Sequence, residues 1–166
     1  MFTRRHVFLA GTALAALAAG RLVRSGDARA ATTYEVTHTD EEWRKLLSPE
    51  AYQVLRHENT ERPFSSPLLH EHRAGIFGCG GCDLPLYSSK TKYDSGTGWP
   101  SFWAPLANAV EEKEDRTFGM VRTAISCRRC GGHLGHVFND GPKPTGLRYC
   151  MNGVALKFVP ATPSSS

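Results

Sequence analysis

The chain has 166 residues, 40% of them hydrophobic, which is enough for one domain with its own core. Its formal charge of +4 would suit a nucleic-acid-binding protein, but residues 1–30 hold five arginines and one aspartate and so carry the whole excess. The other fifteen basic and fifteen acidic residues balance, which argues against a nucleic-acid partner.

Residues 1–30 have the layout of an export signal. The pair Arg4-Arg5 precedes an apolar run, residues 7–19, and the small-residue sequence 28–30 (ARA) is typical of a cleavage site. The run is shorter than the roughly 20 residues of a membrane span. Paired arginines favour a twin-arginine signal over an ordinary secretory one, and an uncleaved anchor is the alternative. We expect cleavage after Ala30, no stable membrane insertion afterwards, and a periplasmic or otherwise exported product.

Two short helices are predicted next. Thr39 and Glu42 have the spacing of a capping box, and apolar residues follow on one helical face. Ser48 and Pro49 then suit the N-cap and first position of a second helix that ends near His57 or Glu58.

Short strands are predicted for most of the rest of the chain. Glycine and proline break the sequence after residue 62, and residues 95–100 form a loop or turn. The strand candidates are residues 75–78, 84–87, 110–112, 117–126, 133–138 and 148–158. We expect one mainly β, mostly antiparallel domain over residues 31–160, with two N-terminal helices and a disordered tail at 161–166.

Four cysteines form two C-x-x-C pairs, Cys79 with Cys82 and Cys127 with Cys130, separated by 44 residues. Such pairs match a closed tetrahedral zinc site, although structural disulfides and a redox-active pair are alternatives. Neighbouring glycines permit the tight turns of a thiolate site, which favours one structural zinc ion. Four protein ligands would leave no coordination position for a substrate.

The fifth cysteine, Cys150, lies two residues from Arg148 and two from Asn152. In a strand these three side chains share one face, and a cation beside a thiol lowers the pKa of that thiol. Cys150 is therefore a candidate nucleophile. A buried core cysteine is the alternative, because Val154 and Leu156 continue the same face as an apolar row.

Four motifs resemble the methionine sulfoxide reductase B family in order and spacing. They are residues 95–102 (SGTGWPSF), 132–138 (GHLGHVF), 140–142 (DGP) and 148–152 (RYCMN). The resemblance covers about residues 43–158, and the cysteine pairs match the zinc-binding members. It implies two antiparallel sheets, the β-tent-like fold of that family, and reduction of the R epimer of methionine sulfoxide, either in proteins and peptides or as the free amino acid.

The resemblance also implies roles for individual residues. Cys150 attacks the sulfoxide sulfur and becomes a sulfenic acid. The sulfoxide oxygen is lined by His133, His136 and Asn152, and the thiolate is surrounded by a polar network that includes Arg148 and Asp140. Trp99 borders the substrate methyl group, and Phe102 belongs to the same aromatic group, which suits an apolar, polarizable thioether.

Two departures from the family pattern bear on function. Thr97 stands where many members have a second, resolving cysteine, so we expect an external reductant, either a thioredoxin-like protein or a small thiol. Gly153-Val154-Ala155 replaces the usual serine-containing continuation after Asn152. We expect a monomer. A zinc-dependent binding module and a thiol-disulfide oxidoreductase are the alternative functions.

Overall fold

Two helices begin the part of the chain that the computed structural model describes, residues 33–162. The export signal, the cleavage site after Ala30 and residues 163–166 lie outside it. Helix α1 (Asp40–Leu46) begins with the predicted capping box, in which Thr39 and Glu42 bond to each other reciprocally. Helix α2 (Pro49–His57) is capped by Ser48, which accepts the Ala51 N–H. Both predicted helix starts are confirmed.

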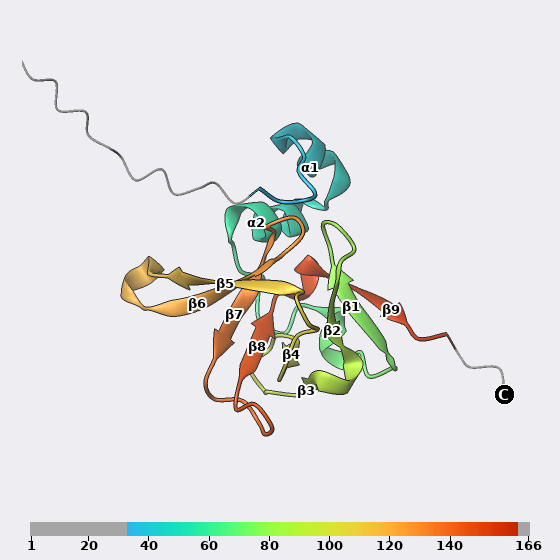
Figure 1. Ribbon diagram of the computed structural model, residues 1–166, viewed down its shortest axis with the longest axis vertical. Coiled ribbons are helices and arrows are strands. Elements are labelled where there is room, and N and C mark those ends of the chain that lie inside the picture. The colour runs from blue at the N-terminus through green and yellow to red at the C-terminus, as the bar shows by residue number, and fades with distance from the viewer. Residues whose placement is uncertain (1–32, 163–166) are drawn as a thin grey trace, which may run out of the picture. The chain divides into compact units, whose positions relative to one another are not determined.

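Helix α2 connects the helical part to the sheets. It buries Tyr52, Val54 and Leu55, and its Arg56 donates from Nη1 to the Cys130 carbonyl at 3.1 Å. Figure 1 shows both helices at one end of the strands. No helix within residues 33–162 combines the length and apolar character required to cross a membrane.

All strands pair antiparallel, in two sheets (Figure 1). The three-stranded sheet has the order β2 (Pro85–Ser88), β1 (Gly75–Cys79), β9 (Leu156–Pro160). The six-stranded sheet has the order β3 (Lys92–Tyr93), β4 (Ser101–Phe102), β8 (Arg148–Met151), β7 (His133–Phe138), β6 (Arg122–Cys127), β5 (Val110–Asp115). Four 3-10 turns complete the described chain: η1 (Pro67–His70), η2 (Ser89–Thr91), η3 (Thr117–Gly119) and η4 (Gly153–Ala155). The mainly β fold with two antiparallel sheets and two helices is confirmed.

Two strand predictions were wrong in their bounds. The candidate 148–158 is two strands, β8 in the larger sheet and β9 in the smaller, separated by η4. A hydrogen bond from the Gly80 N–H to the Ala155 carbonyl, 2.7 Å long, holds this turn in place. Similarly, residues 117–119 form η3, and β6 begins only at Arg122. Alternating apolar residues alone cannot distinguish one long strand from two that a tight turn separates.

The core between the sheets is aromatic. Phe102 stacks on Tyr87 with ring centroids 4.4 Å apart and meets the edge of Phe77 at 5.0 Å. All three side chains are fully buried, as is Met151, whose sulfur lies 3.1 Å from the Tyr87 hydroxyl. These contacts fix the inner face of β4 and β8, so the opposite face of the same two strands is held in position.

Gly135 in β7 allows a close backbone approach to β8. A Cβ there would lie 2.1 Å from the Cys150 carbonyl oxygen, so Gly135→Ala must separate β7 from β8. We expect a loss of at least about 2 kcal/mol in the free energy of unfolding, measured by urea denaturation. Gly96→Ala is the control: Gly96 has φ +69 but no atom within 4 Å of its Cβ position, so only the backbone strain of about 1 kcal/mol applies. Equal losses in the two variants would contradict this account.

Candidate functional site

The two C-x-x-C pairs meet in space, as the sequence predicted. The Sγ atoms of Cys79, Cys82, Cys127 and Cys130 all lie within 4.8 Å of one another. Cys79 and Cys130 approach to 3.7 Å, and Cys82 and Cys127 to 3.5 Å. A disulfide would need about 2.05 Å. Four sulfurs placed tetrahedrally at about 2.3 Å from a zinc ion lie about 3.8 Å apart, so the spacing fits a metal site better than a disulfide.

Burial and charge also fit a cation at this cluster. Cys79 and Cys127 are fully buried, and Cys82 is the one partly exposed member. Hydrogen bonding with Cys127, Cys130 and Cys82, together with burial, raises the pKa of the Cys79 thiol. Four thiolates side by side would repel one another strongly without a metal ion between them. The cluster therefore suits a structural ion held by four thiolates.

Cys150 lies apart from that cluster, in the middle of the six-stranded sheet. In β8 it pairs with His136 of β7 on one side and with Ser101 of β4 on the other. Its side chain is partly exposed, unlike Cys79 and Cys127. The position differs from that of a core cysteine, because Tyr149 and Met151, its neighbours in β8, are the residues that face the core.

A cavity of about 130 Å³ opens over Cys150. His136, Asn152 and Trp99, three of the predicted site residues, contribute to its wall. The full set of lining residues is Thr60, Trp99, Arg122, Gly135, His136, Phe138, Cys150 and Asn152. Residues from five separate parts of the sequence thus line the cavity that holds the Cys150 side chain.

A chain of hydroxyl groups leads from the core to Cys150. Ser101 donates to the Trp99 carbonyl at 3.0 Å and lies 2.7 Å from Ser95, which lies 2.8 Å from Thr97. Thr97 Oγ1 is 3.7 Å from the Cys150 Sγ. Each hydroxyl has one proton, so if Ser101 donates to the carbonyl, the other two donate toward Ser101 and Thr97 presents a lone pair to the thiol.

The two histidines occupy different environments. His136 lines the cavity, whereas His133 is buried behind it, with ring centroids 5.3 Å apart. Within the described chain neither ring nitrogen of His133 has a hydrogen-bond partner, and burial lowers the pKa of His133 to about 4. His133 is therefore neutral at pH 7, and it does not reach the cavity wall where the sequence led us to expect it.

Asn152 is held rigidly. Its Nδ2 donates to the Leu134 carbonyl at 3.0 Å, and its Oδ1 accepts the Glu61 N–H at 2.9 Å. An amide nitrogen has two hydrogens, so one remains for a group in the cavity. The side chain can donate there without rearranging.

Arg148 and Asp140 form a bidentate ion pair, with both N–O distances 2.8 Å. The hydrogen bonds from Arg148 hold the pKa of Asp140 below its usual value, and they raise the pKa of Arg148. The guanidinium also lies 4.3 Å from the centre of the Phe138 ring and interacts electrostatically with Cys150. Two of the predicted network residues, Arg148 and Asp140, thus pair with each other, and Asp140 itself stays largely exposed.

The two aromatic residues that were predicted to contact the substrate, Trp99 and Phe102, lie in different environments. Trp99 lines the cavity and donates from Nε1 to the Glu61 carbonyl at 3.2 Å. Phe102, in contrast, is fully buried against Tyr87 and Phe77 and is absent from the cavity wall. Successive side chains of a strand point to opposite faces of the sheet. Ser101 pairs with Cys150 and shares its face, so the next residue, Phe102, must point to the core face.

Sequence reasoning missed several residues that shape the site. Glu61 contacts it through three groups: its carboxylate accepts the N–H groups of Gly153 and Val154 at 2.6 and 2.9 Å, its carbonyl bonds Trp99, and its N–H bonds Asn152. Arg122 and Thr60 line the cavity. None of these lies in the four motifs, and the only signal was an acidic residue in a loop.

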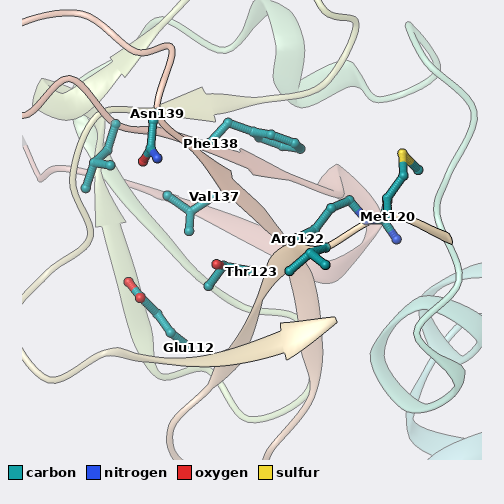
Figure 2. A pocket seen from close by; sticks show the side chains of 9 residues that line it. Glu112, Met120, Arg122, Thr123, Val137, Phe138 and Asn139 are labelled. Atoms are coloured by element: carbon teal, nitrogen blue, oxygen red, sulfur yellow. The ribbon is translucent and has the colours of Figure 1, made fainter. Parts of the chain in front are cut away.

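A second cavity of about 620 Å³ lies against β5, β6 and β7. Figure 2 shows Arg122 and Phe138 on one side of the strands and Val137, Thr123 and Glu112 on the other. Cys150 is not among its lining residues, which are Glu112, Met120, Val121, Arg122, Thr123, Val137, Phe138, Asn139 and Leu147. The larger cavity thus lacks a nucleophile, and the smaller one is the reaction site suggested by the side chains.

Comparisons with known proteins agree with this geometry. A family model described as "SelR domain" matches residues 47–160. The peptide methionine sulfoxide reductase MsrB of Agrobacterium fabrum is 52% identical over 130 residues, which cover 78% of this chain and 96% of the relative. The MsrB proteins of Pseudomonas putida (strain W619) and Thiobacillus denitrificans are each 55% identical, over 76% and 74% of this chain and 96% and 93% of their own. This chain therefore belongs to the SelR-domain family of MsrB methionine sulfoxide reductases.

Proposed function

We propose that this methionine sulfoxide reductase acts on the R epimer of methionine sulfoxide in oxidised proteins or peptides, with Cys150 as the nucleophile. The observation that carries the assignment is the shared cavity of Cys150, His136, Asn152 and Trp99. In this arrangement Trp99 would border the methyl group of the substrate, and His136 and Asn152 would line the sulfoxide oxygen.

The reaction transfers one oxygen between two sulfurs. The Cys150 thiolate attacks the sulfoxide sulfur while a proton reaches the sulfoxide oxygen. The S–O bond of the substrate then breaks and the oxygen ends on Cys150 as a sulfenic acid. Methionine sulfur is reduced by two electrons and Cys150 sulfur is oxidised by two. Two external thiol groups then reduce the sulfenic acid, forming a disulfide and one water molecule.

Of the two histidines, His136 is the one proposed to deliver a proton to the sulfoxide oxygen. His133 has a pKa of about 4 and is buried behind the cavity, so it is neutral at pH 7. His136 lines the cavity, and Asn152 Nδ2 offers a second donor. A positioned acid of this kind contributes about 10²- to 10⁴-fold to a rate.

The four-cysteine site is proposed to hold one structural zinc ion. Its support is the sulfur spacing and the burial of the ligands. A thiol-disulfide oxidoreductase would instead have an oxidisable C-x-x-C pair, yet here the short Sγ contacts run between the two pairs, Cys79 with Cys130 and Cys82 with Cys127. A metal-dependent binding module would not need a partly exposed cysteine in a cavity that His136 and Asn152 also line.

A pair of cysteine variants tests both assignments. Cys150→Ser should abolish sulfoxide reduction while the melting temperature and about one zinc per chain are unchanged, because Cys150 is partly exposed and is not one of the four clustered cysteines. Cys127→Ser should lose zinc and melt at a lower temperature, since structural metal binding is also folding free energy. Turnover is measured on separated epimers, with metal content by mass spectrometry. Activity in Cys150→Ser would contradict the assignment of Cys150 as nucleophile. Full zinc content in Cys127→Ser would contradict the assignment of Cys127 as a metal ligand.

Regeneration is proposed to need an external reductant, either a thioredoxin-like protein or a small thiol. Thr97 occupies the position 3.7 Å from the Cys150 sulfur where a resolving cysteine would lie. Cys79, Cys82, Cys127 and Cys130 are gathered in the metal site, so within the described chain no other thiol is left to attack Cys150.

Without reductant, the protein should reduce one equivalent of sulfoxide, react with a sulfenic-acid trap and show no intramolecular disulfide by non-reducing mass spectrometry. Thr97→Cys should form a disulfide with Cys150 after turnover, because a sulfur at position 97 needs to move by only about 2 Å to reach bonding distance. A disulfide between Cys150 and a C-x-x-C cysteine in the unaltered protein, formed at the turnover rate, would contradict this scheme.

Export by a twin-arginine route is proposed from Arg4-Arg5 and the apolar run that follows. Such a route carries folded proteins, so the metal could bind before the thiols meet an oxidising compartment. Changing both arginines to lysine should leave the precursor inside the cell, detected by fractionation and immunoblotting. Unchanged export of that variant would favour the ordinary secretory route.

A further inference from the structure

Asp115, the last residue of β5, contacts the reaction site from two strands away. Its Oδ2 lies 2.9 Å from His136 Nε2 and 2.6 Å from Arg122 Nη2. Its Oδ1 accepts the Thr117 N–H at 2.9 Å. Both oxygens are thus engaged, and the side chain is only 13% exposed. An exposed surface ion pair would not order a side chain this closely.

The strand register makes the contact possible. Asp115 of β5 pairs with Arg122 of β6. Two residues further along β6, Ala124 pairs with His136 of β7. His136 must cross β6 to reach β5, and Ala124 has only a methyl group in its path. Arg122 reaches the same carboxylate and also lines the cavity over Cys150. Two cavity residues therefore share one anchor outside the cavity.

The Asp115 side chain can only accept hydrogen bonds. The Thr117 N–H and side chain, His136 and Arg122 hold the pKa of Asp115 well below its ordinary value, so it is a carboxylate at neutral pH. A carboxylate has no proton to donate, so His136 Nε2 must carry the hydrogen of the 2.9 Å bond. Nδ1 is then the ring nitrogen that is bare in the neutral imidazole and protonated in the imidazolium.

We infer that Asp115, held by Arg122, is a positioning residue that keeps His136 in the Nε2–H tautomer and so dedicates Nδ1 to the sulfoxide oxygen. This inference rests on the proposed role of His136 as proton donor. In the imidazolium, the proton leaves from Nδ1 to the oxygen, and the carboxylate stabilises the charged ring until it does. In the opposite tautomer the bare Nε2 would face the carboxylate and lose the hydrogen bond. An aspartate likewise orients the acid–base histidine of serine hydrolases, where it accepts from Nδ1–H instead of Nε2–H.

Asp115→Asn separates shape from charge. Asparagine has nearly the same size, but its NH₂ group can donate to His136 Nε2 and thereby favour the Nδ1–H tautomer. We expect kcat to fall at least about 10-fold, because part of the 10²- to 10⁴-fold contribution of a positioned acid would be lost, with KM within about 2-fold of the unaltered enzyme. The matched control is Glu114→Gln, which removes the same charge one residue earlier in β5, where the carboxylate is exposed and pairs with Arg116. The control should retain kcat.

The tautomer is measured directly by two-dimensional ¹H–¹⁵N NMR of the imidazole nitrogens in zinc-loaded Cys150→Ser protein without substrate, with the His136 signals assigned from their loss in His136→Gln. The Nε2–H form should dominate, and adding Asp115→Asn should shift the ring toward Nδ1–H. This readout does not depend on turnover, so it separates failure of the inference from failure of the proposed reaction. A dominant Nδ1–H tautomer with Asp115 intact, or unchanged kcat in Asp115→Asn, would overturn the inference. If Asp115→Asn does not fold, the spectrum of the protein with Asp115 intact still decides.

Discussion

The cluster of four cysteines is the constraint on which the rest of the structure depends. Cys79 ends β1 in the smaller sheet and Cys127 ends β6 in the larger one, so four sulfurs within 4.8 Å of one another join the two sheets. Arg56 of α2 bonds to the Cys130 carbonyl, which ties the helical part to the same point. A metal ion held by the four sulfurs would cross-link the two sheets without oxidising the thiols, and its binding free energy would add to the stability of the fold.

Cys150, the proposed nucleophile, owes its position to the larger sheet. Close approach of β7 and β8 at Gly135 places His136 beside Cys150, and the turn after Met151 carries Asn152 into the same cavity. The core under these strands is closed by Phe102, Tyr87 and Met151. A rigid lower face therefore supports a polar upper face, which favours preorganised donors around the sulfur.

Carboxylates organise the site without lining it. Asp140 holds Arg148, Asp115 holds His136 and Arg122, and Glu61 holds the backbone after Asn152. Each carboxylate accepts at least two hydrogen bonds, which fixes the orientation of its side chain. The cavity is thereby lined by donors and apolar groups, which suits a neutral, dipolar substrate with a strongly accepting oxygen.

Local sequence determined the features that depend on neighbouring residues. The capping box at Thr39 and Glu42, the Ser48-Pro49 helix start, and the pairing of two C-x-x-C motifs could all be predicted because caps and metal ligands need particular residues at particular spacings. The grouping of Cys150, His136, Asn152 and Trp99 could be predicted only through the resemblance of the four motifs to a family.

Tertiary structure decided the features that depend on strand register and burial. It split residues 148–158 between two sheets and turned Phe102 into the core, because an apolar side chain can satisfy either face until its partner strand is known. It left His133 behind the cavity, neutral and without a protein hydrogen bond. It also brought Asp115 and Glu61 to the site across 21 and 91 residues of sequence. A single carboxylate in a strand end or loop has no local pattern, so only the folded register shows which histidine or amide it serves.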